Sequence, residues 1–150
     1  MVKLLTKSDL NCFFKLLNEI DDEFSPSLSS RVTLDEYTLK LLTHATVFGI
    51  FQQEYLVGAI AVYMNDLESG VGYCPFIGVS FKNRKQGLSQ KLLDTAISNL
   101  KDDCFKILRL TVKKDSGAFF LYKKNGFHIV NKFTYSDTNV EGYEMELKLS

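Results

Sequence analysis

The chain has 150 residues, and its 18 Lys and Arg balance 18 Asp and Glu, so the formal net charge is zero. A neutral chain argues against a nucleic-acid binder, because proteins of that class usually carry a basic excess. Hydrophobic residues make up 45% of the chain, yet no uncharged run approaches the roughly 18 residues of a membrane-spanning helix, and the length fits one domain over residues 1–150.

The first half of the chain predicts two helices and an antiparallel set of strands. Apolar residues recur at helical spacing after Ser8 and after Thr33, and both residue types often begin helices. A tight turn at Gln53-Glu54 joins two strands into a hairpin. Pro75 lies inside the next strand and cannot donate to a ladder, so we expect a bulge or an unpaired edge beside it. The expected strands are residues 2–5, 46–52, 55–64 and 71–80, and the expected helices are 10–20 and 34–42.

The second half alternates helices and strands. A helix from Leu88 to about Asp102 precedes a short helix that begins at Asp115 or Ser116. The first of these helices is a crossover between two strands, which makes that pair of strands parallel. The fold class is therefore α/β, of the α+β type, with a mixed central sheet, an antiparallel meander, one parallel pair and about four flanking helices. The expected strands are residues 105–112, 128–135 and 142–149.

The most informative stretch is the basic turn Arg84–Ser89. An apolar strand, Phe76–Val79, precedes it and a helix follows it, so backbone N–H groups converge at the helix N-terminus. The end of the helix adds partial positive charge at the same place. Such a turn suits a pyrophosphate, and we expect a phosphate-bearing cofactor there.

The spacing of the three cysteines does not indicate a metal site. Cys12, Cys74 and Cys104 are odd in number and form no CxxC or Cys/His spacing, and the two histidines lie far apart in sequence. Cys12 and Cys74 have apolar neighbours, as buried thiols do. The N-terminus lacks a basic patch followed by an apolar run, so no signal peptide is expected. We therefore expect a reduced, cytoplasmic protein without a metal.

Two segments together resemble the signatures of the GNAT superfamily of N-acetyltransferases. The run Val79–Ser89 is similar to the family's acetyl-CoA pyrophosphate motif, Gln/Arg-x-x-Gly-x-Gly/Ala, in which Arg84 and Gly87 match and Ser89 replaces the last small residue. Ala118–Phe127 is similar to the second signature, an Ala, a Leu-Tyr pair and then Gly-Phe. The order of the elements resembles the family fold over most of the chain.

The resemblance implies that the two central parallel strands splay apart and that the pantetheine arm of acetyl-CoA, the co-substrate, inserts between them like an added strand. A backbone N–H within residues 77–79 would then stabilise the oxyanion, a role worth roughly 3–4 kcal/mol. Asp115 stands where many members carry an asparagine that contacts the cofactor, and its own contact stays open. The residues that the resemblance assigns to the cofactor are Ile77, Gly78, Val79, Arg84, Lys85, Gln86, Gly87, Leu88, Ser89, Ser116, Phe119 and Tyr122.

Tyr122 matches the position of the family's tyrosine, and the resemblance implies that it is the general acid. The implied reaction is direct attack of a neutral amine on the thioester. A tyrosine with a pKa of about 10 is protonated at pH 7 and can donate to a departing thiolate, whose thiol has a pKa of about 8.5. The alternative is a core tyrosine on an amphipathic helix, with a packing role only.

The general base is unassigned. Residues 71–80 contain no carboxylate, and Tyr73 is the only side chain of that run that both titrates and could touch an acceptor. The carboxylates on segments that border the acceptor cleft in the family are Asp22, Glu23, Glu141 and Glu144, although solvated surface is the usual place of such residues.

The acceptor side is expected in the loop Phe24–Arg31. Ser29, Arg31 and Tyr73 are the candidate substrate-binding residues, because serines and an arginine beside aromatic residues suit a hydroxyl-rich or anionic small molecule, such as a nucleotide-linked amino sugar. A plain capping loop has the same composition. The expected partner is therefore the primary amine of a small molecule, with the protein a monomer or a homodimer.

Three other functions compete with this interpretation. A protein or peptide amine is an alternative acceptor, on which the zero net charge gives little guidance. A non-catalytic acyl-CoA-binding module would explain why no base is visible, although Tyr122 and the intact turn argue against a decayed site. A nucleotide kinase is not supported, because the chain has no GxxxxGK[ST] motif.

Overall fold

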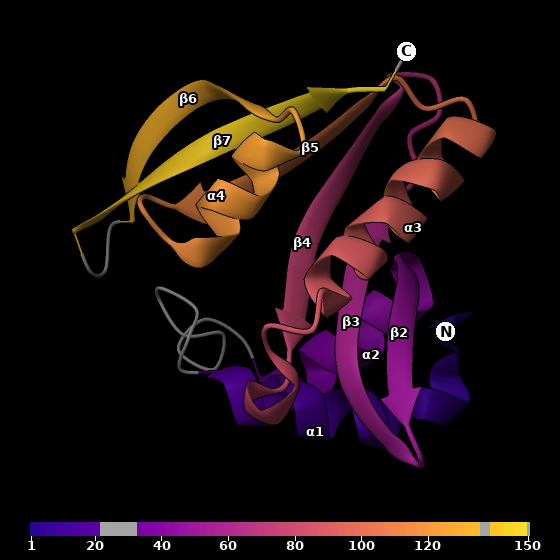
Figure 1. The fold of residues 1–150 in the computed structure, drawn as a ribbon. Coiled ribbons are helices and arrows are strands. Elements are labelled where there is room, and N and C mark those ends of the chain that lie inside the picture. Colours follow the sequence, from indigo (N-terminus) through magenta and orange to yellow (C-terminus); the bar gives the residue numbers. More distant parts are fainter. Residues whose placement is uncertain (22–32, 136–138, 150) are drawn as a thin grey trace.

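The computed structural model describes residues 1–21, 33–135 and 139–149, and its centre is a twisted mixed β-sheet (Figure 1). Within those residues the sheet has seven strands in the order β1-β2-β3-β4-β5-β7-β6. The strands are β1 (Val2–Leu4), β2 (Thr46–Gln52), β3 (Tyr55–Tyr63), β4 (Val71–Val79), β5 (Ile107–Lys113), β6 (His128–Tyr135) and β7 (Val140–Lys148).

Helices cover the two faces of the sheet unequally. The helical elements are η1 (Lys7–Asp9), α1 (Leu10–Ile20), α2 (Leu34–His44), η4 (Phe81–Asn83), α3 (Leu88–Asp102) and α4 (Gly117–Lys124). The helices α1 and α2 pack on β2, β3 and β4, while α3 packs on the opposite face of these strands and α4 on β5 (Figure 1). The face of β5 and β7 that lies on the α1 side has no such helix among the described residues.

The predicted fold class is confirmed. The pair β4–β5 is parallel and every other neighbouring pair in the sheet is antiparallel. Two strand starts were misplaced. The strand β5 begins at Ile107, because the N–H of Phe105 donates to Leu100 at the end of α3. The strand β7 begins at Val140, ahead of the predicted residue 142. Of the two proposed caps of α4, Ser116 holds the position and Asp115 adopts a left-handed conformation with φ 60°.

The parallel pair separates half-way along β4. Its register runs from Val71↔Ile107 to Cys74↔Leu110 and stops there, although both strands continue. The next residue of β4 is Pro75, where the pairing with β3 also shifts its register by a bulge. The proline therefore lies at the bulge that the sequence predicts, directly after the last pair with β5, and Figure 1 shows β4 and β5 diverging along their length.

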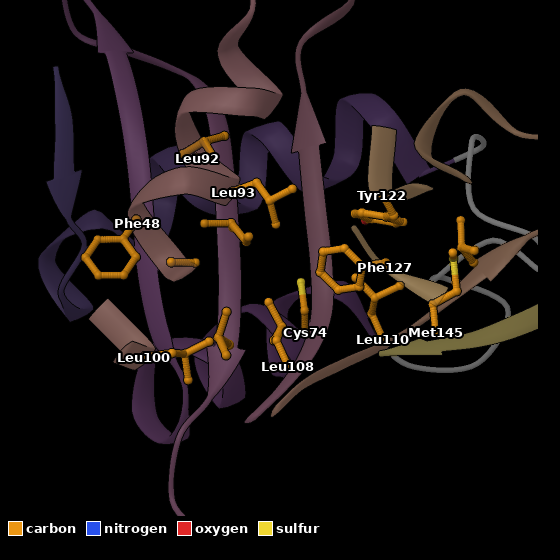
Figure 2. Packing of buried hydrophobic residues seen from close by; sticks show 14 of the residues in the cluster. Phe48, Cys74, Leu92, Leu93, Leu100, Leu108, Leu110, Tyr122, Phe127 and Met145 are labelled. Carbon is orange, nitrogen blue, oxygen red and sulfur yellow. The ribbon is translucent and has the colours of Figure 1, made fainter. Parts of the chain in front are cut away.

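Two hydrophobic clusters fill the faces of the sheet. The cluster on the α1 side is built around Phe13 and Phe76, whose rings meet edge-on at 5.7 Å. The other cluster lies under α3 and α4, and Figure 2 shows part of it. Its labelled members are Phe48, Cys74, Leu92, Leu93, Leu100, Leu108, Leu110, Tyr122, Phe127 and Met145.

Candidate active site

The turn between β4 and α3 presents its backbone to solvent. Lys85 and Gly87 have left-handed conformations, with φ 63° and 75°. Gly87 is the N-cap of α3 and offers no side chain to cap it, and the first helical bond runs from the Lys91 N–H to the Gly87 carbonyl at 3.2 Å. The N–H groups of Leu88 and Ser89 therefore have no intrahelical acceptor. A Cβ at Gly87 would meet nothing within 4 Å, so space for a ligand lies directly against this backbone.

Arg84 turns its guanidinium back onto the turn. Its Nε and Nη2 donate to the Val79 carbonyl at 3.2 and 3.1 Å, and its Cζ lies over the Phe81 ring, 4.4 Å from the ring centre. The side chain therefore shapes the turn from inside, and the backbone of the turn is the part directed outward.

The end of β4 is held from the α1 side by contacts that the sequence did not indicate. The carboxylate of Glu19, in the last turn of α1, accepts hydrogen bonds from the Ser80 hydroxyl and the Phe81 N–H. At Gly78, an added Cβ would collide with the Ile20 Cδ1. Gly78 therefore serves the close approach of α1 to β4, in addition to any role toward a cofactor.

The backbone of β4 beyond the bulge has one side without a strand partner. The Ser80 N–H donates to the Val57 carbonyl of β3 at 2.8 Å. Successive residues of a strand direct their backbone groups to opposite sides, so those of Ile77 and Val79 point away from β3, toward the side that β5 has left. An extended chain could pair with β4 at this place.

Tyr122 is buried in the hydrophobic cluster that also holds Cys74 and Leu110, the last pair before the strands separate. It is 4% exposed, lies with its ring 5.4 Å from that of Phe127, and belongs to the same cluster as Cys74 (Figure 2). Burial, and secondarily the charge that Cys74 would carry, raise the pKa of Tyr122 well above its usual value. Burial raises the pKa of the Cys74 thiol to about 12. Both groups therefore keep their protons at neutral pH.

Ser116 and Phe119 are engaged within the protein. The Ser116 hydroxyl accepts from the Phe119 N–H at 3.2 Å and donates to the Lys113 carbonyl at 2.8 Å, so it fixes the start of α4. The Phe119 ring is buried and packs 5.2 Å from that of Tyr143. Both residues position the helix that carries Tyr122.

A row of polar side chains crosses the sheet beside the separation. The register pairs Tyr63 with Tyr73, Tyr73 with Arg109, Arg109 with Glu146, and Glu146 with His128. The guanidinium of Arg109 and the carboxylate of Glu146 form an ion pair at 2.6 Å. Leu108 and Leu110 face the cluster under α3, so Arg109 between them faces the side of α1 and α2.

The structure describes only some of the other residues that the sequence proposes for the acceptor side. Glu144 pairs in register with Thr111, the first residue of β5 beyond the separation. Glu141 is bound by the Lys114 ammonium at 2.9 Å. Ser29, Arg31, Asp22 and Glu23 lie outside the described residues.

Neither a metal centre nor a membrane helix emerges from the described parts of the chain. Their His, Cys, Asp and Glu side chains form no group of three or more that could hold a metal ion. No helix there is long and apolar enough to cross a membrane.

Comparisons with known proteins point to one family. The model of the acetyltransferase (GNAT) domain matches residues 16–149 of the chain. No curated protein sequence matches it significantly.

Solved structures share the fold at low sequence identity. The ribosomal-protein-S18-alanine N-acetyltransferase from Escherichia coli has a TM-score of 0.81 at 17% identity, with 100% of this chain and 94% of that chain covered. A GNAT-family acetyltransferase from Streptococcus pneumoniae gives 0.81 at 18% identity, covering 100% and 99%. The PaiA N-acetyltransferase from Thermoplasma acidophilum, solved with coenzyme A, gives 0.75 at 17% identity, covering 99% and 98%.

Proposed function

Because this chain belongs to the GNAT acetyltransferase family, and is thus an acetyl-CoA-dependent N-acetyltransferase, we propose that it acetylates the primary amine of a small molecule with Tyr122 as the general acid. The observation that carries this proposal is the uncapped N-terminus of α3, which opens beside the gap between β4 and β5. A nucleotide-linked amino sugar is the more specific candidate acceptor, on the composition of the loop that contains Ser29 and Arg31.

The exposed turn fits the diphosphate of acetyl-CoA. The backbone N–H groups of Lys85, Gln86, Gly87, Leu88 and Ser89 supply donors at a helix N-terminus, and the open space at Gly87 lets phosphate oxygens approach them closely. The outward N–H groups of Ile77 and Val79 and the carbonyl of Ile77 fit the amide groups of the pantetheine arm, while the Val79 carbonyl already accepts from Arg84. Ser116 and Phe119 act indirectly: they fix the position of α4, which carries Tyr122.

The residues of the gap then perform acyl transfer. Acetyl-CoA supplies an acetyl group activated as a thioester. A backbone N–H of β4, at Ile77 or Val79, would donate to the carbonyl oxygen as negative charge develops on it, for a contribution of about 3 kcal/mol. The amine nitrogen would bond to the carbonyl carbon as the C–S bond breaks, and the proton that the amine loses would pass to solvent. Tyr122 holds its proton because burial keeps its pKa high, and it would donate that proton to the departing sulfur and regain one from solvent. Cys74 keeps its own proton and is no competing nucleophile.

A protein or peptide N-terminus is the second candidate acceptor. The face of β5 and β7 on the α1 side is not covered by a packed helix among the described residues, and it carries Arg109 and Glu146 of the polar row. A polar sheet face of this kind could accommodate an extended chain. The related fold of the S18-alanine N-acetyltransferase keeps this option open.

The cellular compartment is proposed from the state of the cysteines. We place the protein in the cytoplasm, where its three thiols, none in a disulfide, would stay reduced. Residues 1–150 would act as one catalytic domain, as a monomer or a homodimer.

A panel of amines tests this function. Purified protein would be mixed with acetyl-CoA and, in turn, amino sugars, their nucleotide-linked forms, polyamines and short peptides, and free thiol would be measured. Thiol release with one class above the no-amine rate would support the proposal and name the acceptor. Binding of acetyl-CoA without thiol release for any amine would favour a non-catalytic acyl-CoA-binding module.

A further inference from the structure

The carboxylate of Glu19 binds the chain where β4 ends. One oxygen, Oε2, accepts from the Ser80 hydroxyl at 2.8 Å and from the Phe81 N–H at 2.9 Å. Ser80 is 7% exposed, whereas Glu19 lies on the exposed side of α1. A single carboxylate oxygen thus gathers the two donors at which the turn toward α3 begins.

Glu19 replaces a cap that the local sequence would supply. Ser80 is the N-cap of η4, and a serine at such a position usually accepts from the N–H groups that follow it. Its side chain accepts no such bond here, and its hydroxyl donates to Glu19. The cap therefore comes from another helix, and its negative charge also suits the start of a helical turn.

The position of η4 decides where the next backbone amides point. The turn enters η4 from Ser80, whose N–H is held by Val57 and whose carbonyl accepts from the buried Asn83 at 3.0 Å. The chain leaves η4 at Arg84 and reaches α3 through the left-handed Lys85 and Gly87. Since so few residues separate η4 from α3, a shift of η4 would move the amides of the turn.

We propose that Glu19 is a positioning residue for the cofactor turn: through Ser80 and Phe81 it holds η4 and thereby aims the N–H groups of residues 85–89. This inference rests on the proposed function, because it takes those N–H groups to bind the diphosphate of acetyl-CoA. Glu19 does not bind the diphosphate itself, since a carboxylate would repel it.

Two substitutions of Glu19 separate its hydrogen bonds from its charge. Both donors converge on one oxygen, so the amide oxygen of Glu19→Gln can accept both bonds without the charge. Glu19→Ala loses both bonds. Glu36→Ala is the matched control, because Glu36 is an exposed carboxylate in the first turn of α2. Ser80→Ala removes one of the donors and tests the same contact from the other side, should Glu19→Ala fail to fold.

The test measures the binding of coenzyme A and of pantetheine, which lacks the diphosphate. Calorimetry or NMR titration gives the Kd of each. We expect Glu19→Ala to raise the Kd for coenzyme A about tenfold, Glu19→Gln to change it less than about threefold, and the Kd for pantetheine to stay constant in both. Ser80→Ala should fall between them and Glu36→Ala should match the wild type.

Unchanged coenzyme A binding by Glu19→Ala and Ser80→Ala would overturn this role. Equal weakening of coenzyme A and pantetheine would overturn it as well, because Glu19 would then support the gap between the strands and not the turn. A wild-type protein that binds no coenzyme A would instead reject the proposed function, and this role with it.

Discussion

Cys74 and Leu110 are the last residues that pair across the parallel ladder between β4 and β5. Beyond them β4 stays with β3, up to the pair of Val79 with Gly58, and β5 stays with β7. The gap between the two strands therefore begins beside Cys74, which belongs to the same hydrophobic cluster as Tyr122. The reacting groups are expected at this point, with the diphosphate turn further along β4.

Removal of the Tyr122 hydroxyl should slow turnover while leaving the cofactor bound. A positioned general acid contributes about 10²–10⁴-fold, so kcat of Tyr122→Phe should fall by about that range. The Kd for acetyl-CoA should stay within about threefold, because the ring still packs against Phe127. Steady-state kinetics and calorimetry measure the two quantities. Tyr55→Phe is the control, since Tyr55 is 65% exposed at the start of β3. An unchanged kcat in Tyr122→Phe would show that Tyr122 only packs in the core and is not the general acid.

Cys74 should make stability fall at alkaline pH. Its pKa rises from the usual 9.0 to about 12 in the folded protein, so between these values the unfolded chain loses a proton that the folded protein keeps. The free energy of unfolding then decreases with pH, at about 1.4 kcal/mol per pH unit for one group. Urea unfolding from pH 8 to 11 should show this slope in the wild type and a shallower one in Cys74→Ala. The exposed Cys104 provides the control, Cys104→Ala. Parallel slopes in wild type and Cys74→Ala would contradict the buried thiol.

Glu144 and Glu146 should separate acceptor recognition from stability. Glu146 is held by Arg109 at 2.6 Å and its side chain is 16% exposed, so Glu146→Gln should lower the free energy of unfolding by about 1–3 kcal/mol. Glu144 faces the same side but lies opposite Thr111 and not opposite a cation. With the amine found by the panel, Glu144→Gln should raise KM for that amine about tenfold and leave the Kd for acetyl-CoA unchanged. Equal KM values for Glu144→Gln and wild type would remove Glu144 from the acceptor site.

The fold was predictable because local sequence patterns determine its helices and strands. Strand alternation, helical spacing and a crossover helix determine the sheet, and Pro75 marks the bulge because a residue without an N–H must leave the ladder. The turn before α3 was equally visible, since its glycine and its neighbours on either side are contiguous. The contact of Glu19 with Ser80 was not, because it joins residues 61 apart through tertiary packing alone. The row from Tyr63 to His128 depends on strand register, and the direction of the Arg84 side chain depends on the local backbone, so neither could be predicted from the sequence.

The most direct measurement of the central claim is the affinity of Gly87→Glu for coenzyme A. A glutamate at Gly87 has room in the ligand-free protein, since nothing lies within 4 Å, but it would place a negative charge and extra bulk against the diphosphate. Gly87→Asn is the control, because asparagine tolerates the left-handed conformation at φ 75°. We predict that calorimetry will show binding by the wild type and Gly87→Asn and a loss of about 100-fold or more in Gly87→Glu. Wild-type affinity in a folded Gly87→Glu would show that coenzyme A does not bind at the start of α3.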